Sequence, residues 1–239
     1  MAMPSSEWTV RGHGPIEQLA DNLWWVQGDV PRIPLHRNMV VVRRTDGSLL
    51  VHNAIALREA EQAQLEALGR PAILIVPNAF HRLDAAAYKA RYPQLQVIAP
   101  AGASKQVEAV VPVDATYDQF PADDATRVEY IGGVRKAEGA LVVSSKDGTT
   151  VIVNDAVFNM DRPTGTVARI ISTVMNNAGG PRVSRLTKLL LVKDRAAFRA
   201  TLERFAALPD LQRFIVAHDK CVVGREAAAT ALRTAAASI

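Results

Sequence analysis

The sequence predicts an α/β protein built as a four-layer sandwich, in which two stacked sheets are each covered by helices. Two observations support this architecture: an order of hairpin, helix and strand that occurs twice, and an apolar run at 72–76 bounded by prolines. Such a run is typical of a strand buried on both faces. One unit leaves a sheet face bare, and two units bury both faces by stacking. We therefore expect a single αββα domain over residues 1–239.

The first unit begins with two strand-like runs, 39–44 and 48–53, that are joined by Thr45-Asp46-Gly47. An Asp-Gly pair supplies the positive φ angles of a tight turn, so these runs predict a hairpin. Residues 56–69 are rich in good helix formers, which predicts a helix, and Gly69-Arg70-Pro71 predicts where it ends. The apolar strand at 72–76 completes the unit.

The second unit repeats this order further along the chain. Strand-like runs at 141–145 and 149–154 flank Lys146-Asp147-Gly148, which predicts a second hairpin. A helix is expected over 194–208, with Asp194 as its N-cap, and the strand RFIVAHD follows it. The two halves of the chain therefore follow one design.

The remaining segments give weaker predictions. Residues 84–92 are typical of a short helix, and residues 224–239 of an alanine-rich surface helix. His52 is expected to point outward or lie at the rim, and Cys221 to be a small buried hydrophobe. Other expected elements are an irregular lead-in at 1–22, strands at 23–27, 95–99 and 127–131, a loop at 30–37, and two helical pieces with a mobile connection within 162–191.

Composition excludes several classes of function. The chain has 28 basic and 24 acidic residues, no basic run longer than two, and only 5% aromatic residues, so neither the charged grooves nor the stacking platforms of nucleic-acid binders are visible. A single cysteine excludes an internal disulfide and a cysteine-based zinc cluster. No apolar stretch is long enough to span a membrane. We expect a cytoplasmic protein with no nucleic-acid or membrane partner.

Polar residues follow three of the predicted core strands. Open α/β sheets hold their ligands at the ends of buried strands. We therefore expect these side chains to meet at one edge of the sandwich, which we call the rim. The candidate ligand-pocket residues are Asn78, His81, Arg82, Asp84, Asn154, Asp155 and His218.

Three segments carry a resemblance to the metallo-β-lactamase superfamily over roughly residues 20–220: the strand and histidine-bearing loop at 72–84, VIVNDAVFN at 151–159, and FIVAHD at 214–219. The sequence resembles more closely a branch catalogued only as a domain of unknown function, through NLW at 22–24, residues 37–57 and PNAFH at 77–81. The resemblance implies an αββα sandwich and, in active members, a hydrolytic centre with one or two metal ions.

The metal-binding motif implied by the resemblance is degenerate here. His-x-His-x-Asp-His falls on residues 77–82, where Pro77 and Ala79 replace two histidines, His81 replaces the aspartate and Arg82 replaces the last histidine. The loop expected to supply a third histidine, near 131–135, contains none. Asp155 and His218 match the bridging aspartate and the final histidine. We therefore expect no ordinary binuclear zinc site, and Arg82 is expected to pair with Asp155.

Three classes of function remain open. The favoured one needs no cofactor: a binding protein, or an enzyme without a binuclear centre, that holds a small acidic or neutral molecule near Asn78, Arg82 and His218. Alternatively, His81, Asp155 and His218 hold one zinc or iron ion in a mononuclear hydrolase. Asp84 would then be a fourth ligand, a base or a partner that orients His81. The third class is a structural or partner-binding subunit. A homo-oligomer is compatible with each class, and no catalytic residue is assigned.

Overall fold

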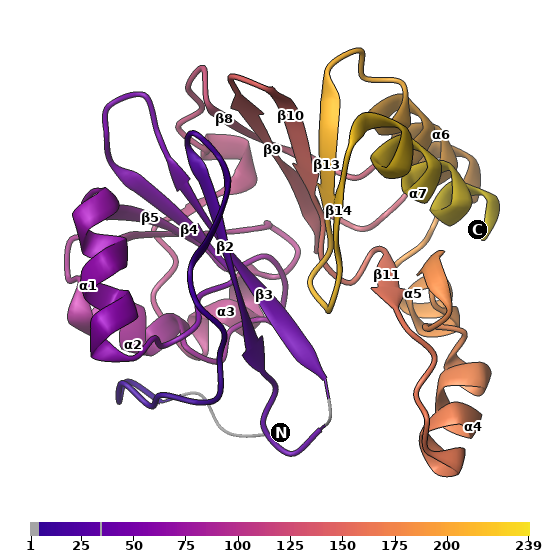
Figure 1. Cartoon of the computed structure of the whole chain (residues 1–239), viewed down its shortest axis with the longest axis horizontal. Helices are drawn as coiled ribbons and strands as arrows, with labels where there is room; N and C mark the ends of the chain where they lie inside the picture. The colour runs from indigo at the N-terminus through magenta and orange to yellow at the C-terminus, as the bar shows by residue number, and fades with distance from the viewer. Residues whose placement is uncertain (1–4, 34) are drawn as a thin grey trace.

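The computed structural model describes residues 5–33 and 35–239. Two sheets stack face to face with helices on their outer sides, so the predicted αββα sandwich is confirmed (Figure 1). The first sheet has seven strands in sequence order: β1 (Glu17–Ala20), β2 (Leu23–Asp29), β3 (His36–Arg43), β4 (Leu49–His52), β5 (Pro71–Ile75), β6 (Gln96–Ala99) and β7 (Ala115–Thr116).

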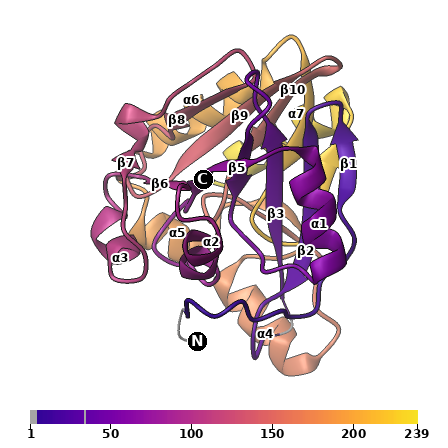
Figure 2. The same ribbon diagram turned by 90° about the vertical axis from the view of Figure 1, so that its left-hand side faces the viewer.

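The second sheet has five strands, in the spatial order β14 (Cys221–Val223), β13 (Leu211–Ile215), β10 (Gly148–Ile152), β9 (Gly139–Ser145) and β8 (Thr126–Tyr130). Strands β11 (Phe158–Met160) and β12 (Gly180–Arg182) form a separate ribbon. The outer face of the first sheet carries α1 (Glu59–Leu68), α2 (Ala85–Arg91) and α3 (Ser104–Glu108) (Figure 2). The second sheet is covered by α6 (Arg195–Ala206) and α7 (Arg225–Ala237), whereas α4 (Thr166–Met175) and α5 (Arg185–Leu190) project from the sandwich.

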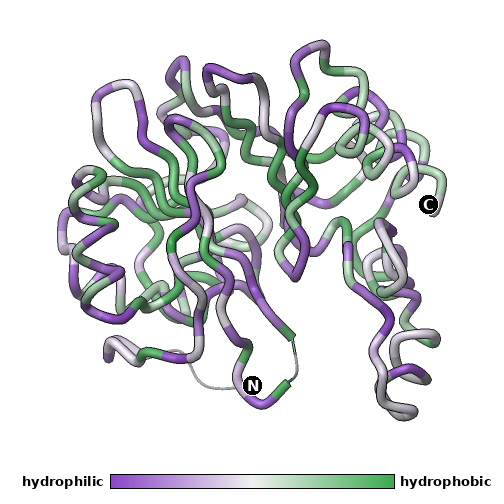
Figure 3. Tube along the Cα trace, viewed as in Figure 1, coloured by the Kyte–Doolittle hydropathy of each residue, from purple (hydrophilic) through white to green (hydrophobic). Residues whose placement is uncertain are grey.

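The buried side chains fall into three separate apolar clusters, as four layers require. Along β3, Val40 and Val42 pack between the two sheets, while Met39 and Val41 pack under the helices of the first half. This alternation follows from the pleat, which turns successive side chains to opposite faces. The apolar colour in Figure 3 accordingly concentrates along the strands.

The predicted repeat is also present. In each half an antiparallel hairpin is followed by a parallel strand: β3 and β4 with β5, and β9 and β10 with β13. The second hairpin strand shows a register irregularity in both halves, next to Leu49 and next to Thr149. Asp194 caps α6 as expected, by accepting hydrogen bonds from the backbone N–H groups of Ala196 and Ala197. The two halves thus bring the ends of β5, β10 and β13 to one rim.

Several local predictions were wrong. The loop expected at 30–37 is shorter, because β3 begins at His36 and pairs with Asp29 at the end of β2. Helix α7 is not only a surface helix: five of its alanines and Leu232 are buried against α6 and β13. Between α4 and α5 the chain forms strand β12. Among the described residues, no helix is both long and apolar enough to cross a membrane.

Candidate metal centre

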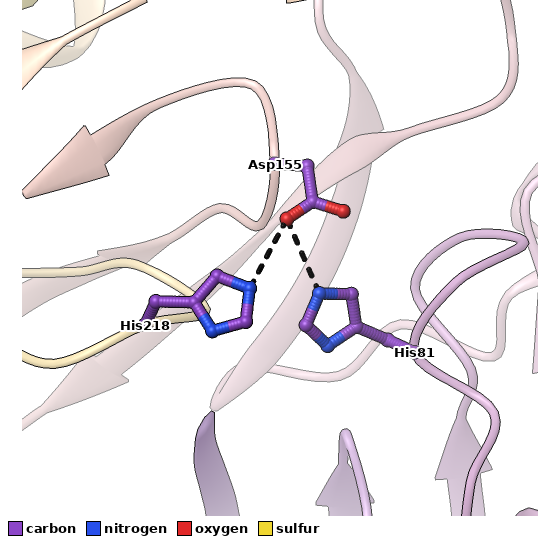
Figure 4. A group of neighbouring side chains, drawn as sticks. All are labelled: His81, Asp155 and His218. Atoms are coloured by element: carbon purple, nitrogen blue, oxygen red, sulfur yellow. Dashed lines mark hydrogen bonds and ion pairs between the residues drawn. The ribbon is translucent and has the colours of Figure 1, made fainter. Parts of the chain in front are cut away.

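Three of the predicted site residues meet at the rim, each just after a core strand. His81 follows β5, Asp155 follows β10 and His218 follows β13 (Figure 4). The Nε2 atom of His81 lies 3.2 Å from Oδ1 of Asp155, and Nε2 of His218 lies 3.5 Å from the same oxygen. One ligand atom from each residue lies within 4.8 Å of the others. The structure therefore brings together the residues that the sequence assigned to a single metal ion.

In both imidazoles the nitrogen that faces away from Asp155, Nδ1, has a hydrogen-bond partner. Nδ1 of His218 lies 2.7 Å from the backbone carbonyl of His36, and Nδ1 of His81 lies 3.2 Å from Oδ1 of Asn53. Oδ1 is the acceptor because Nδ2 of Asn53 donates to the carbonyl of Asn38. In a neutral ring the proton is therefore on Nδ1, and the lone pair of Nε2 points at Asp155.

The loop that carries His81 is held by two asparagines. Asn78 accepts hydrogen bonds from the backbone N–H groups of Phe80 and His81, at 2.8 and 3.0 Å. Asn53 adopts a left-handed conformation with a φ of 58°, which asparagine tolerates better than most residues. Its side chain bonds to strand β3 on one side and to His81 on the other. The position of His81 is therefore set by polar contacts on both sides of its loop.

The charges of the three residues depend on one another. Burial alone would raise the pKa of Asp155, but the adjacent His81 and His218 outweigh it and hold that pKa well below its ordinary value. Burial alone would lower the pKa of His218, but the hydrogen bond and negative charge of Asp155 raise it. Asp155 is thus an anion faced by two imidazoles.

A fully buried glutamate, which the sequence interpretation missed, supports the same centre. Glu138 accepts hydrogen bonds from the backbone N–H groups of Asn154 and Ala156, at 3.0 and 2.8 Å. Asn78 links Glu138 to the centre by donating to both Glu138 and Asp155. Burial, reinforced by the charge of Asp155, raises the pKa of Glu138 to about 8. Glu138 lies in a stretch without clear periodicity, so no sequence signal identified it.

Arg82 and Asp84 do not join the centre. Arg82 donates to the backbone carbonyl of Gln106 in α3, so its expected pairing with Asp155 is not formed. The loop turns between His81 and Arg82, and the two side chains leave it in different directions. The predicted ligand pocket beside Arg82 is therefore not supported.

Asp84 instead binds the guanidinium groups of Arg11 and Arg37 and the backbone N–H of Ala56. It is 4% exposed and has no contact with His81 among the described hydrogen bonds and ion pairs. Its partner Arg37 is likewise almost fully buried. The expected roles of Asp84 as ligand, base or partner of His81 are therefore wrong, and it anchors the lead-in segment and β3.

Asn154 and His52 lie behind the centre. Nδ2 of Asn154 is 3.4 Å from Nε2 of His52, and both side chains are buried. The expectation that His52 points outward was wrong, because β4 is buried on both of its faces. Burial lowers the pKa of His52 to about 3, with a smaller contribution from His81, so this imidazole is neutral.

The centre is partly accessible. The side chains of His81, Asp155 and His218 are 7%, 17% and 11% exposed, and the ring of Phe158 stacks on His218. Two cavities of about 610 and 340 Å³ open beside the β2–β3 hairpin. They adjoin the centre through His36 and do not contain the three residues. The chemistry of the side chains, rather than cavity size, therefore locates the candidate site.

Known structures with the same arrangement of elements identify the fold. A metallo-β-lactamase from Erythrobacter litoralis, crystallised with beta mercaptoethanol in its active site, superimposes with a TM-score of 0.62, covering 94% of this chain and 96% of that one. The chain has the metallo-β-lactamase fold. The DIM-1 metallo-β-lactamase exposed to ceftazidime gives a TM-score of 0.61 over 93% of this chain and 95% of its own, and that from Pontibacter korlensis gives 0.57 over 94% and 99%.

Sequence identity to these three metallo-β-lactamases is 15%, 14% and 9%. At that level the likeness establishes the shared fold and does not extend to activity. Comparison with models of protein families and with curated proteins gives no match.

Proposed function

We propose that this chain is a mononuclear metal-dependent hydrolase in which Nε2 of His81, Oδ1 of Asp155 and Nε2 of His218 hold one divalent transition-metal ion. The observation that carries the proposal is the convergence of two imidazole lone pairs on one carboxylate oxygen, while both Nδ1 atoms are bonded to outer acceptors. Three electron-rich atoms so placed require a positive species among them. Ligand histidines are characteristically oriented in this way through their second nitrogen.

The two separations from Oδ1 of Asp155 suit a metal ion. Zinc binds imidazole nitrogen and carboxylate oxygen at about 2.0–2.2 Å, so two ligands at a tetrahedral angle lie about 3.3 Å apart. The two distances from Asp155 Oδ1, 3.2 and 3.5 Å, bracket that value. Two nitrogens and one carboxylate suit zinc or iron with open positions for water and substrate. A second ion is not supported, since Pro77 and Ala79 occupy two of the motif positions that resemblance assigns to histidines.

The residues of this chain would have distinct tasks. A bound ion would supply Lewis acidity and lower the pKa of a bound water. His36 and Asn53 would keep both imidazoles in the tautomer that presents Nε2. Asn78 would hold the second oxygen of Asp155, to which it donates at 3.0 Å, so that Oδ1 stays directed at the histidines. The substrate class we propose is a small molecule that reaches the rim.

A metal-free role is the second candidate, and one observation favours it. A proton shared among His81, Asp155 and His218 would also satisfy the three facing atoms, and the raised pKa of His218, to which Asp155 contributes, makes its protonated form accessible. The protein would then bind a small acidic or neutral molecule without catalysing hydrolysis. Metal content separates the two candidates.

The test is elemental analysis of protein purified without a chelating tag, followed by titration of chelator-treated protein with Zn²⁺, Fe²⁺ and Mn²⁺. We expect about one equivalent of one of these metals. His81→Ala and His218→Ala should lose it, whereas His13→Ala, a matched change outside the centre, should keep it. Less than about a tenth of an equivalent in folded wild-type protein, whichever metal is supplied, would support the metal-free candidate instead.

If metal binds, hydrolysis of chromogenic ester and phosphodiester substrates should be lost in His81→Ala and retained in His13→Ala. Full metal loading without hydrolysis of any substrate class would support a mononuclear metal protein but not a hydrolase.

A further inference from the structure

Helices α4 and α5 expose an unusual concentration of apolar side chains. Of the eight large apolar side chains exposed in the described part of the chain, Val174 on α4 and Leu186, Leu189 and Leu190 on α5 account for four, with exposed fractions of 57%, 47%, 77% and 50%. The three leucines have i, i+3, i+4 spacing and share one face of α5. Arg185 donates to the carbonyl of Val174, which joins α5 to the end of α4.

The opposite face of α5 packs on the body of the protein. Thr187 is buried, and its hydroxyl donates to the backbone carbonyl of Asp155 at 2.8 Å. Val183, just before the helix, is fully buried in the core of the second half. The leucine face is therefore the exposed face of α5, and Figure 1 shows α4 projecting from the sandwich with α5 between it and the body.

Residues 162–193, which we name the α4–α5 projection, also carry a one-sided charge. The segment contains six Lys and Arg residues and no Asp or Glu, whereas the whole chain has a net charge of only +4. Arg162, Arg169, Arg185 and Lys193 are exposed. Partial burial lowers the pKa of Lys188, and the nearby charges of Arg195 and Arg185 add to the shift. The projection thus exposes both apolar and cationic side chains.

The charge restricts what can cover this surface. A second copy docked through the same patch would bring two segments with six cations each into contact, and like charges in an interface are unfavourable. The projection contains no aromatic residue, so the stacking surface used to bind single-stranded nucleic acid is missing. Exposed leucines on a segment whose charged residues are all Lys and Arg are typical of a helix that lies in the boundary of an anionic bilayer.

We propose that the α4–α5 projection docks the protein reversibly on bilayers that contain anionic lipids. The leucine face of α5 enters the headgroup boundary, and the surrounding cations contact lipid phosphates and carboxylates. The expectation of no membrane partner rested on the lack of a spanning segment, whereas this contact needs none. Because Thr187 bonds to Asp155, docking would place the rim of the sandwich one helix away from the lipid surface. The proposal does not depend on metal at the rim.

The test is co-sedimentation of the full chain with vesicles of phosphatidylcholine alone and with added phosphatidylserine. We expect binding only to the anionic vesicles, and weaker binding as salt is raised. Arg185→Glu and Lys193→Glu should each weaken binding at least about fivefold, the effect of losing one cation near the surface. Leu189→Ser combined with Leu190→Ser should abolish it. Circular dichroism would verify that each variant is folded.

Two matched controls remove similar groups elsewhere. Val223→Ser replaces an apolar side chain on β14 that is 59% exposed, as the leucine variants do on α5. Lys146→Glu reverses the charge of a side chain that is 87% exposed. Both variants should bind like wild type. Equal affinity for neutral and anionic vesicles, no binding to either, or equal losses in the controls would overturn the proposal. A concentration-dependent dimer that Leu189→Ser dissociates would assign the surface to a second copy, and retardation of RNA by the projection would assign it to nucleic acid.

Discussion

Replacing Asp84 by asparagine tests whether this residue serves the rim or only the fold. Asp84 is 4% exposed and neutralises Arg37, whose side chain is 5% exposed, and Arg11, which lies 2.9 Å away. Removing one partner of a buried ion pair costs about 3–5 kcal/mol, because the other charge stays buried without compensation. Asparagine keeps one acceptor oxygen, so we expect the lower end, about 3 kcal/mol, or a fall in Tm of about 6–12 °C for a domain of this size.

The assay is urea and thermal unfolding followed by circular dichroism, together with metal titration of each variant. Asp161→Asn is the matched control, since its ion pair with Lys220 is exposed and should contribute less than about 1 kcal/mol. Metal stoichiometry should be the same in both variants and in wild type. If Asp84→Asn left the stability unchanged but lost the bound metal, the structural role would be refuted and a role of Asp84 in metal binding would be supported.

Three further predictions concern Cys221, which is partly rather than fully buried, the buried His52 and the cap of α6. Burial raises the pKa of Cys221 to about 11, so iodoacetamide at about pH 8.5 should alkylate the native thiol far more slowly than the urea-unfolded one; equal rates would contradict this. The pKa of His52 is lowered to about 3, so the unfolded chain binds an extra proton below its ordinary pKa near 6.5, and stability should fall as pH drops from there toward 3. His52→Gln should show a shallower loss of unfolding free energy over that range. Asp194→Ala should cost about 1 kcal/mol in urea unfolding by removing the cap of α6, and no change would show that solvent replaces the cap.

The repeated pattern made the architecture predictable from the sequence. The two Asp-Gly turns and the apolar runs beside them define both hairpins locally, and the need to cover two bare sheet faces then leaves few arrangements. The burial of His52 could not be read in the same way, because a strand covered on both faces does not alternate in polarity.

The candidate site was only partly predictable. His81, Asp155 and His218 each follow an apolar strand, so their meeting follows from the sheet order. The partners of Asp84 lie in the lead-in and β3, and no local pattern reveals such distant ion pairs. Glu138 resembles any surface glutamate in the sequence, and only its burial against the backbone of 154–156 distinguishes it.

The rim draws its residues from both repeats: His81 belongs to the first, and Asp155 and His218 belong to the second. A metal ion or ligand bound by all three residues would contact both halves of the protein. Because it would bind only the folded state, its affinity would increase the free energy of unfolding. Opening of the space between the two sheets would then require release of the bound species. Amide hydrogen exchange in the strands that face this space should therefore slow when the site is filled.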